Sequence, residues 1–150
     1  MSGTVGDNSA VFFYSSTLIL VKIIWAVALG AAIGGVSRYY FTMTVQPRLG
    51  SFPWSTMIIN VSGSLILGFI MSYALATPGI SLEIRALLTT GFCGGFTTFS
   101  TYSYETARLL EDGDYERAGL YAFSSMALAL AATFAGFMAA RGMIALRDRA

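Results

Sequence analysis

Histidine is absent from this sequence of 150 residues, and cysteine occurs only once, as Cys93. Without an imidazole the chain lacks the usual haem ligand, the base of a Ser-His pair, the H-E-x-x-H zinc motif and histidine proton relays. A single cysteine forms no internal disulfide, and no cysteine cluster offers a metal site. These absences argue against the common catalytic centres, and we predict that the protein is not an enzyme.

Charged residues are also scarce. They make up 11% of the chain, and hydrophobic residues make up 55%, whereas soluble domains carry about 25% charged residues. A water-soluble domain of this size could not bury so much apolar side chain, because small domains leave much of their surface exposed. The formal net charge of +1 provides no basic field for nucleic acid, and no motif suggests a nucleotide site. The composition predicts an integral membrane protein.

Four apolar stretches are long enough to cross a membrane as helices, which takes about 20 residues. The first runs from about Leu18 to Ser37 and contains Lys22, whose long side chain can reach the headgroup region. The other three cover residues 54–76, 86–104 and 118–140. We therefore predict an all-α membrane protein of four transmembrane helices, with residues 18–150 as a single domain and residues 1–17 as a disordered extension.

The positive charges divide almost evenly between the two sides of the membrane. Four helices place both termini on one side, with Lys22, Arg85, Arg141, Arg147 and Arg149, and leave Arg38, Arg48, Arg108 and Arg117 on the other. The charged segment 105–117 is expected to lie outside the membrane. This five-to-four division gives no firm orientation by the positive-inside rule. Either one boundary is misplaced, or the chain inserts in both orientations.

The third apolar stretch contains residues that disfavour a regular helix. Gly91, Gly94 and Gly95 are followed by Thr97 and Thr98, and neither glycine nor β-branched threonine favours a helix interior. A broken helix at membrane depth is tolerated where protein or water satisfies the freed backbone groups, and freed carbonyl oxygens can hold a hard cation. The alternative is that the glycines let two helices pack closely. From the spacing alone both interpretations remain open.

Aromatic side chains follow directly. Phe99 and Tyr102 are three positions apart and therefore share a helix face. Because an aromatic ring has a positive edge, rings turned edge-on could hold an anion in a dry pore less tightly than a lysine would. The alternative is an aromatic pair that packs in the core or against lipid.

Polar residues on two other stretches could assist an anion. Tyr121, Ser125, Ala129 and Thr133 follow one another at a spacing of four, which stacks them along the fourth stretch. Their three hydroxyls would donate to an anion that sheds its water, or would bond back to their own helix carbonyls. Asn60 in the second stretch needs partners for its amide, either on a neighbouring helix or in an ion.

Taken together, these motifs resemble the Fluc family of fluoride channels, also called CrcB. The resemblance rests on four features. Three are the stretches GAAIGGVSR at 30–38, TMIINVSGSLILG at 56–68 and GFCGGFTTFSTYSYE at 91–105, and the fourth is the hydroxyl series of residues 121–133. They occur in the family's order and spacing, from about Leu18 to Ala145. The core TGFCGGFTTFST is the most specific of them.

The resemblance implies an assembly and a function. It implies a dual-topology homodimer of two antiparallel subunits, which would account for the even charge division. Two pores per dimer would export fluoride passively across the cell (inner or plasma) membrane. A structural sodium ion at the dimer centre would be held by the backbone carbonyls of Gly94 and Thr97. The residues implied for the fluoride pathway are Arg38, Asn60, Thr98, Phe99, Tyr102, Tyr121, Ser125 and Thr133.

Two positions depart from the family pattern. Tyr102 stands where most members have phenylalanine, and Ala129 replaces a hydroxyl residue often found there. Rival functions fit less well. A small multidrug transporter needs a carboxylate in its first helix, which is missing here, and a non-transporting assembly subunit would not explain the segment GGFTTFS at 94–100.

Overall fold

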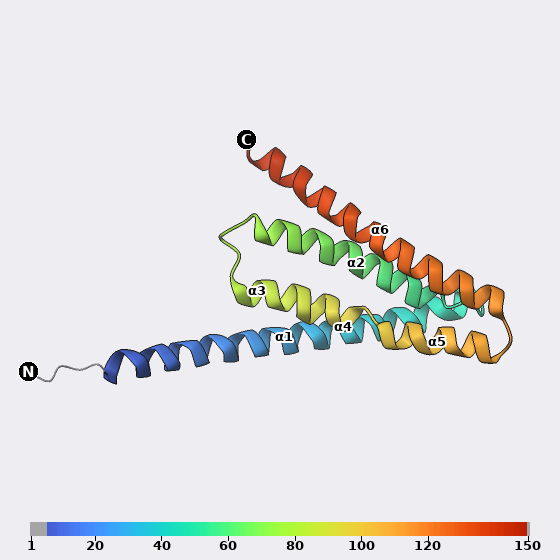
Figure 1. Cartoon of the computed structure of the whole chain (residues 1–150), viewed down its shortest axis with the longest axis horizontal. Coiled ribbons are helices and arrows are strands. Elements are labelled where there is room, and N and C mark those ends of the chain that lie inside the picture. The colour runs from blue at the N-terminus through green and yellow to red at the C-terminus, as the bar shows by residue number, and fades with distance from the viewer. Residues whose placement is uncertain (1–5, 150) are drawn as a thin grey trace, which may run out of the picture.

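The computed structural model describes residues 6–149, without the side chains of residues 6–13 and 15. Three helices are long, namely α1 (Gly6–Leu49), α2 (Trp54–Leu75) and α6 (Tyr115–Arg147). Between α2 and α6 the chain forms four shorter segments: α3 (Leu82–Ala86), the π-helix η1 (Leu87–Cys93), α4 (Gly94–Phe96) and α5 (Phe99–Glu111) (Figure 1). The predicted all-helical class is confirmed for this part of the chain.

Three of the predicted spans are single helices. By length and hydropathy, Ser16–Leu49, Trp54–Leu75 and Tyr115–Arg147 are long and apolar enough to cross a membrane. The remaining span is built from α3, η1, α4 and α5 in succession. The four-helix arrangement is therefore confirmed, with three continuous members and one segmented member.

Helix α1 begins earlier than the sequence predicted. Residues 6–17, which were expected to be disordered, already belong to it, while residues 1–5 lie outside the described residues and their disorder stays a prediction. Residues 10–21 contain neither glycine nor proline, so nothing in the local sequence stops the helix. At its other end, α1 stops before Gly50, whose φ of +83° is the left-handed conformation typical of a helix end.

The segmented span is interrupted at Thr97 and Thr98. Both residues are extended, with ψ angles of 159° and 117°, and they separate α4 from α5 in Figure 1. The Thr98 side chain then caps the new helix, because its Oγ1 accepts the backbone N–H of Thr101 at 3.1 Å. The predicted break is confirmed, and it lies at the two threonines rather than at the glycines.

The glycines of this span serve close packing instead. A methyl group on Gly91 would come within 2.9 Å of the Val27 carbonyl, and one on Gly95 would clash with the backbone of Ala31. Both contacts are with α1. Of the two interpretations left open by the spacing, the helix break therefore applies to the threonines and close helix packing applies to the glycines. Small residues that let membrane helices approach closely are a common packing device.

Helices α2 and α6 pack in the same way. A methyl group on Gly68 would overlap the Thr133 carbonyl, and one on Gly136 would overlap the Leu65 carbonyl. The bundle thus contains two closely packed groups. Helix α2 packs against α6, and α1 packs against both η1 and α4 (Figure 1).

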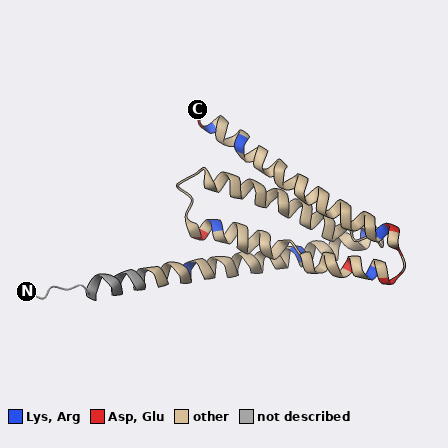
Figure 2. Ribbon diagram, viewed as in Figure 1, with Lys and Arg blue, Asp and Glu red and all other residues tan. Residues whose placement is uncertain are grey.

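Most charged residues lie near the ends of the bundle, and few lie between them (Figure 2). At the α5–α6 turn, Arg108 pairs with Glu111 and Asp112, and Arg117 pairs with Asp114. Between the ends, outward side chains are mostly apolar and exposed, such as Trp25 on α1 at 72%. An apolar belt between two charged ends is the surface that a bilayer requires.

Candidate functional site

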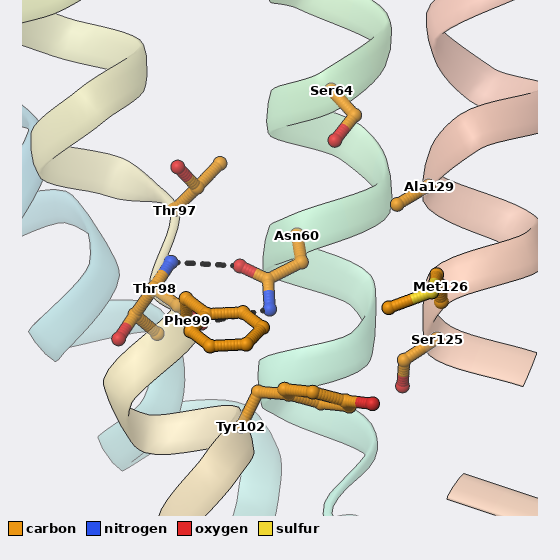
Figure 3. A pocket seen from close by; sticks show the side chains of 9 residues that line it. All are labelled: Asn60, Ser64, Thr97, Thr98, Phe99, Tyr102, Ser125, Met126 and Ala129. Atoms are coloured by element: carbon orange, nitrogen blue, oxygen red, sulfur yellow. Dashed lines mark hydrogen bonds between the residues drawn. The ribbon is translucent and has the colours of Figure 1, made fainter. Parts of the chain in front are cut away.

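An open pocket of about 260 Å³ lies where the break faces α2 and α6 (Figure 3). Five residues predicted for the ion pathway line it: Asn60, Thr98, Phe99, Tyr102 and Ser125. The other lining residues are Ser64, Thr97, Met126 and Ala129. The structure therefore brings together residues that are far apart in the sequence and lie on different elements.

The Asn60 amide is bonded to the break through both of its polar atoms. Its Nδ2 donates to the Thr98 carbonyl at 3.0 Å, and its Oδ1 accepts the Thr98 backbone N–H at 2.8 Å (Figure 3). Of the two possibilities for this amide, the structure shows the bond to a neighbouring helix. Because Nδ2 carries two hydrogens, one N–H remains beyond the bond to Thr98.

Two hydrogen bonds at the break, one to Asn60 and one to the Thr98 hydroxyl, deprive two carbonyls of their helical donors. In a continuous helix the Thr98 N–H would donate to the Gly94 carbonyl, and the Thr101 N–H to the Thr97 carbonyl. Here the first donates to Asn60 and the second to the Thr98 hydroxyl. Carbonyl oxygens released in this way are ligands of the kind that hard cations take in membrane proteins.

The two aromatic rings of the pocket have different surroundings. Phe99 is 73% exposed, and its ring centroid lies 5.5 Å from that of Tyr102. The Tyr102 hydroxyl donates to the Ala122 carbonyl of α6 at 3.0 Å. The hydroxyl that distinguishes Tyr102 from phenylalanine is therefore bound by α6, and it ties α5 to that helix.

Ser125 presents a polar atom that lacks a partner. Its residue is 4% exposed, and among the described residues its Oγ finds no hydrogen-bonding group. Buried polar atoms are nearly always hydrogen-bonded, so this enclosed hydroxyl stands out as a group on the pocket lining whose hydrogen-bonding capacity is unused.

The other members of the α6 series are engaged elsewhere. The Thr133 hydroxyl bonds back to the Ala129 carbonyl at 3.0 Å, which was the alternative considered for it. Tyr121 is fully buried and does not line the pocket. Four residues correspond to 400° of an α-helix, so each step turns the side chain by about 40°. Over three steps the series rotates by about 120°, which is why only Ser125 and Ala129 face the pocket.

Glu105 is a half-buried acidic residue that the sequence did not single out. Its Oε2 accepts the Tyr121 hydroxyl at 2.6 Å, and its Oε1 accepts the Thr56 hydroxyl at 2.9 Å. Tyr121 and Thr56 are 0% and 2% exposed. The sequence grouped Glu105 with the charged segment expected outside the membrane, and the structure shows that its carboxylate is bonded to residues of α2 and α6. Its position one turn after Tyr102 was the available signal, because both residues lie on the α5 face toward α2 and α6.

Arg38 lies in a second, neighbouring pocket of about 240 Å³. Hydroxyl residues contribute much of its lining, including Thr42, Thr56, Thr98 and Thr101. Arg38 is thus separate from the first pocket, and Thr98 is the residue that lines both.

Comparison with known proteins shows which chains this one is similar to. Residues 25–137 match the family described as CrcB-like protein, Camphor Resistance (CrcB). The "Fluoride-specific ion channel FluC" of Geobacter sulfurreducens is 50% identical over 119 residues, which cover 79% of this chain and 96% of that protein. The protein of the same name from Chlorobaculum tepidum is 44% identical over 123 residues, covering 82% and 98%. Every residue that lines either pocket falls within residues 25–137, the range matched by the family.

Proposed function

This chain belongs to the CrcB-like family, and on that premise we propose that it is a channel that exports fluoride passively across the cell membrane. Its long apolar helices and its channel relatives make it a multi-pass membrane protein. The relatives are named as ion channels, so the prediction of a non-enzymatic protein is confirmed.

The unpartnered Ser125 hydroxyl beside the exposed Phe99 ring is the observation that best supports this proposal. An anion in a narrow path must exchange its hydration shell for protein donors. The Ser125 O–H, the remaining Asn60 N–H and the positive ring edge of Phe99 are donors of moderate strength, which hold an anion without trapping it. Fluoride is small enough to approach such groups closely, and the larger chloride is excluded.

The membrane potential supplies the driving force in this proposal. Fluoride enters cells as the neutral weak acid, ionises inside and leaves as the anion through the channel. A potential of 100 mV contributes about 2.3 kcal/mol per elementary charge, so export needs neither ATP nor a coupled ion. This role places the protein in the inner or plasma membrane.

The working unit in this proposal is an antiparallel homodimer of dual topology with two pores. Two features support it. The pocket is open, with Phe99 at 73% exposure, so a second subunit is needed to close it. The five-to-four division of Lys and Arg also gives no preferred orientation.

The same proposal includes a structural sodium ion at the dimer centre, held by the carbonyls of Gly94 and Thr97. These two oxygens fit the role, because the amides that would bind them in a continuous helix bond to Asn60 and to the Thr98 hydroxyl instead. The bound ion would supply a fixed positive charge that compensates the freed carbonyl dipoles.

Ion release from liposomes tests the proposed function. Purified protein is reconstituted into vesicles loaded with equal concentrations of fluoride and chloride, and ion-selective electrodes record both anions after a potential is imposed. The proposal expects fluoride release without chloride release. Equal release of both anions would refute selectivity, and release of neither would favour a non-transporting subunit.

A further inference from the structure

Two arginines from different helices bind one residue at the α2–α3 connection. Arg85 of α3 donates from Nη2 to the Thr77 carbonyl at 3.3 Å. Arg147 near the end of α6 donates from Nη1 to the Thr77 hydroxyl at 3.0 Å. Thr77 directly follows Ala76, the C-cap of α2, so both guanidinium groups meet where this membrane-length helix ends.

Arg85 lacks an acidic partner at this end. None of the ion pairs among residues 6–149 includes it, and its Nε is buried without a hydrogen-bond partner. Glu83, two positions before Arg85, forms none of the ion pairs in this part of the chain either.

Stabilisation of the α2 C-terminus explains only part of this arrangement. Cations near a helix C-terminus interact favourably with its dipole, and one N–H of each arginine serves Thr77 in that way. Arg147 also pairs through Nε with Asp148 at 3.1 Å. Each guanidinium has five N–H donors, so several donors remain on the terminal nitrogens beyond the bonds to Thr77 and Asp148. A group that satisfies them must carry negative charge and several acceptor oxygens.

A phosphate group has this chemistry, since the planar fork of arginine matches phosphate oxygens. The end of a membrane-length helix lies at the level of the lipid headgroups, and basic sites there bind anionic headgroups. We propose that Arg85 and Arg147 bind the headgroup phosphate of an anionic phospholipid at the α2–α3 connection. Neither arginine lines the pockets described above, so this site does not depend on fluoride conduction.

Lipid retention by the full chain tests the site. The protein is purified in detergent with equal amounts of phosphatidylglycerol and phosphatidylcholine, and bound lipid is counted by native mass spectrometry. Wild type is expected to retain phosphatidylglycerol preferentially and to gain thermal stability from it. The double variant Arg85→Gln/Arg147→Gln is expected to lose about tenfold or more in retention, since it lacks both charged donors.

The matched control removes two positive charges from the opposite end. Arg108 and Arg117 already have carboxylate partners, so Arg108→Gln/Arg117→Gln should retain phosphatidylglycerol as wild type does. Should the Gln pair fail to fold, Arg85→Lys/Arg147→Lys keeps the charge but removes the fork, and it should also bind more weakly.

Three results would overturn the proposal. One is a wild-type protein that retains both lipids equally, which decides the matter without any variant. Another is undiminished retention by the variants at Arg85 and Arg147. The third is stabilisation by inorganic phosphate without retention of phosphatidylglycerol, because the ligand would then be a free anion and not a lipid.

Discussion

The side chain of Asn60 is joined to the backbone of Thr98 by two hydrogen bonds of 2.8 and 3.0 Å. One residue of α2 thereby replaces the helical partners that the break removes. It holds the extended backbone in place and leaves the Gly94 carbonyl without its helical donor, while the Thr98 hydroxyl takes the donor of the Thr97 carbonyl. Because this pair of residues fixes the start of α5, it also fixes the position of the pocket.

Replacement of Asn60 by alanine should therefore destabilise the break. The Thr98 N–H and carbonyl would both lose a partner, and each unsatisfied buried group costs about 1–3 kcal/mol. We expect a clear fall in the thermal unfolding temperature together with loss of fluoride flux. Ser64→Ala, one turn further along α2 on the same pocket, is the control and should keep its stability. An Asn60→Ala protein as stable as wild type would contradict the role of this pair.

Ser125→Ala should separate function from stability. The Ser125 hydroxyl has no protein partner, so its removal leaves no group unsatisfied and the unfolding temperature should stay the same or rise. Loss of one donor to the anion should lower fluoride flux about tenfold, which corresponds to about 1.4 kcal/mol. Ser124→Ala is the matched control, because that hydroxyl bonds back to Leu120. Equal flux in both variants would remove Ser125 from the pathway.

The contact between Glu105 and Tyr121 should be measurable as a coupling energy. Glu105→Gln, Tyr121→Phe and the double variant form a cycle that isolates the pair, and a hydrogen bond to a charged group contributes about 1.5–3 kcal/mol. Glu111→Gln serves as the surface control, since its exposed pair with Arg108 should contribute less than about 1 kcal/mol. Additive single changes in unfolding free energy would show that the pair is not coupled.

Removal of sodium should weaken the proposed assembly. If the carbonyls of Gly94 and Thr97 hold a sodium ion, exchange of sodium for a large organic cation should lower the unfolding temperature and increase the monomer fraction in light scattering. Re-addition of sodium should restore both. Identical behaviour in the two buffers would argue against a structural ion at the break.

The break was predictable from sequence, but its position was not. The run of Gly and Thr at residues 91–98 has low helix propensity, and that signal is local. The exact site depends on Asn60, which lies on another helix 38 residues away and competes for the Thr98 amide. A hydrogen bond to a distant helix cannot be inferred from the helix propensity of the segment itself.

The candidate pathway was predicted in part for a related reason. Asn60, Phe99 and Ser125 lie together, whereas Tyr121 and Thr133 turn away because a spacing of four drifts around the helix. Glu105 was missed because carboxylates usually indicate a solvent-exposed position, and because its partners Thr56 and Tyr121 lie on two other helices. The early start of α1 was missed because the small polar residues that begin the chain resemble a disordered end.

Fluoride release from liposomes by the Phe99→Ile variant, measured beside Phe123→Ile, tests the proposed pathway most directly. Both side chains are largely exposed in the subunit, at 73% and 78%, but only Phe99 lines the pocket at the break. If Phe99 lines the fluoride pathway, Phe99→Ile should abolish fluoride release while the protein keeps its fold and assembly, and Phe123→Ile should conduct as wild type does. Full fluoride release by a folded Phe99→Ile protein would contradict this role of Phe99.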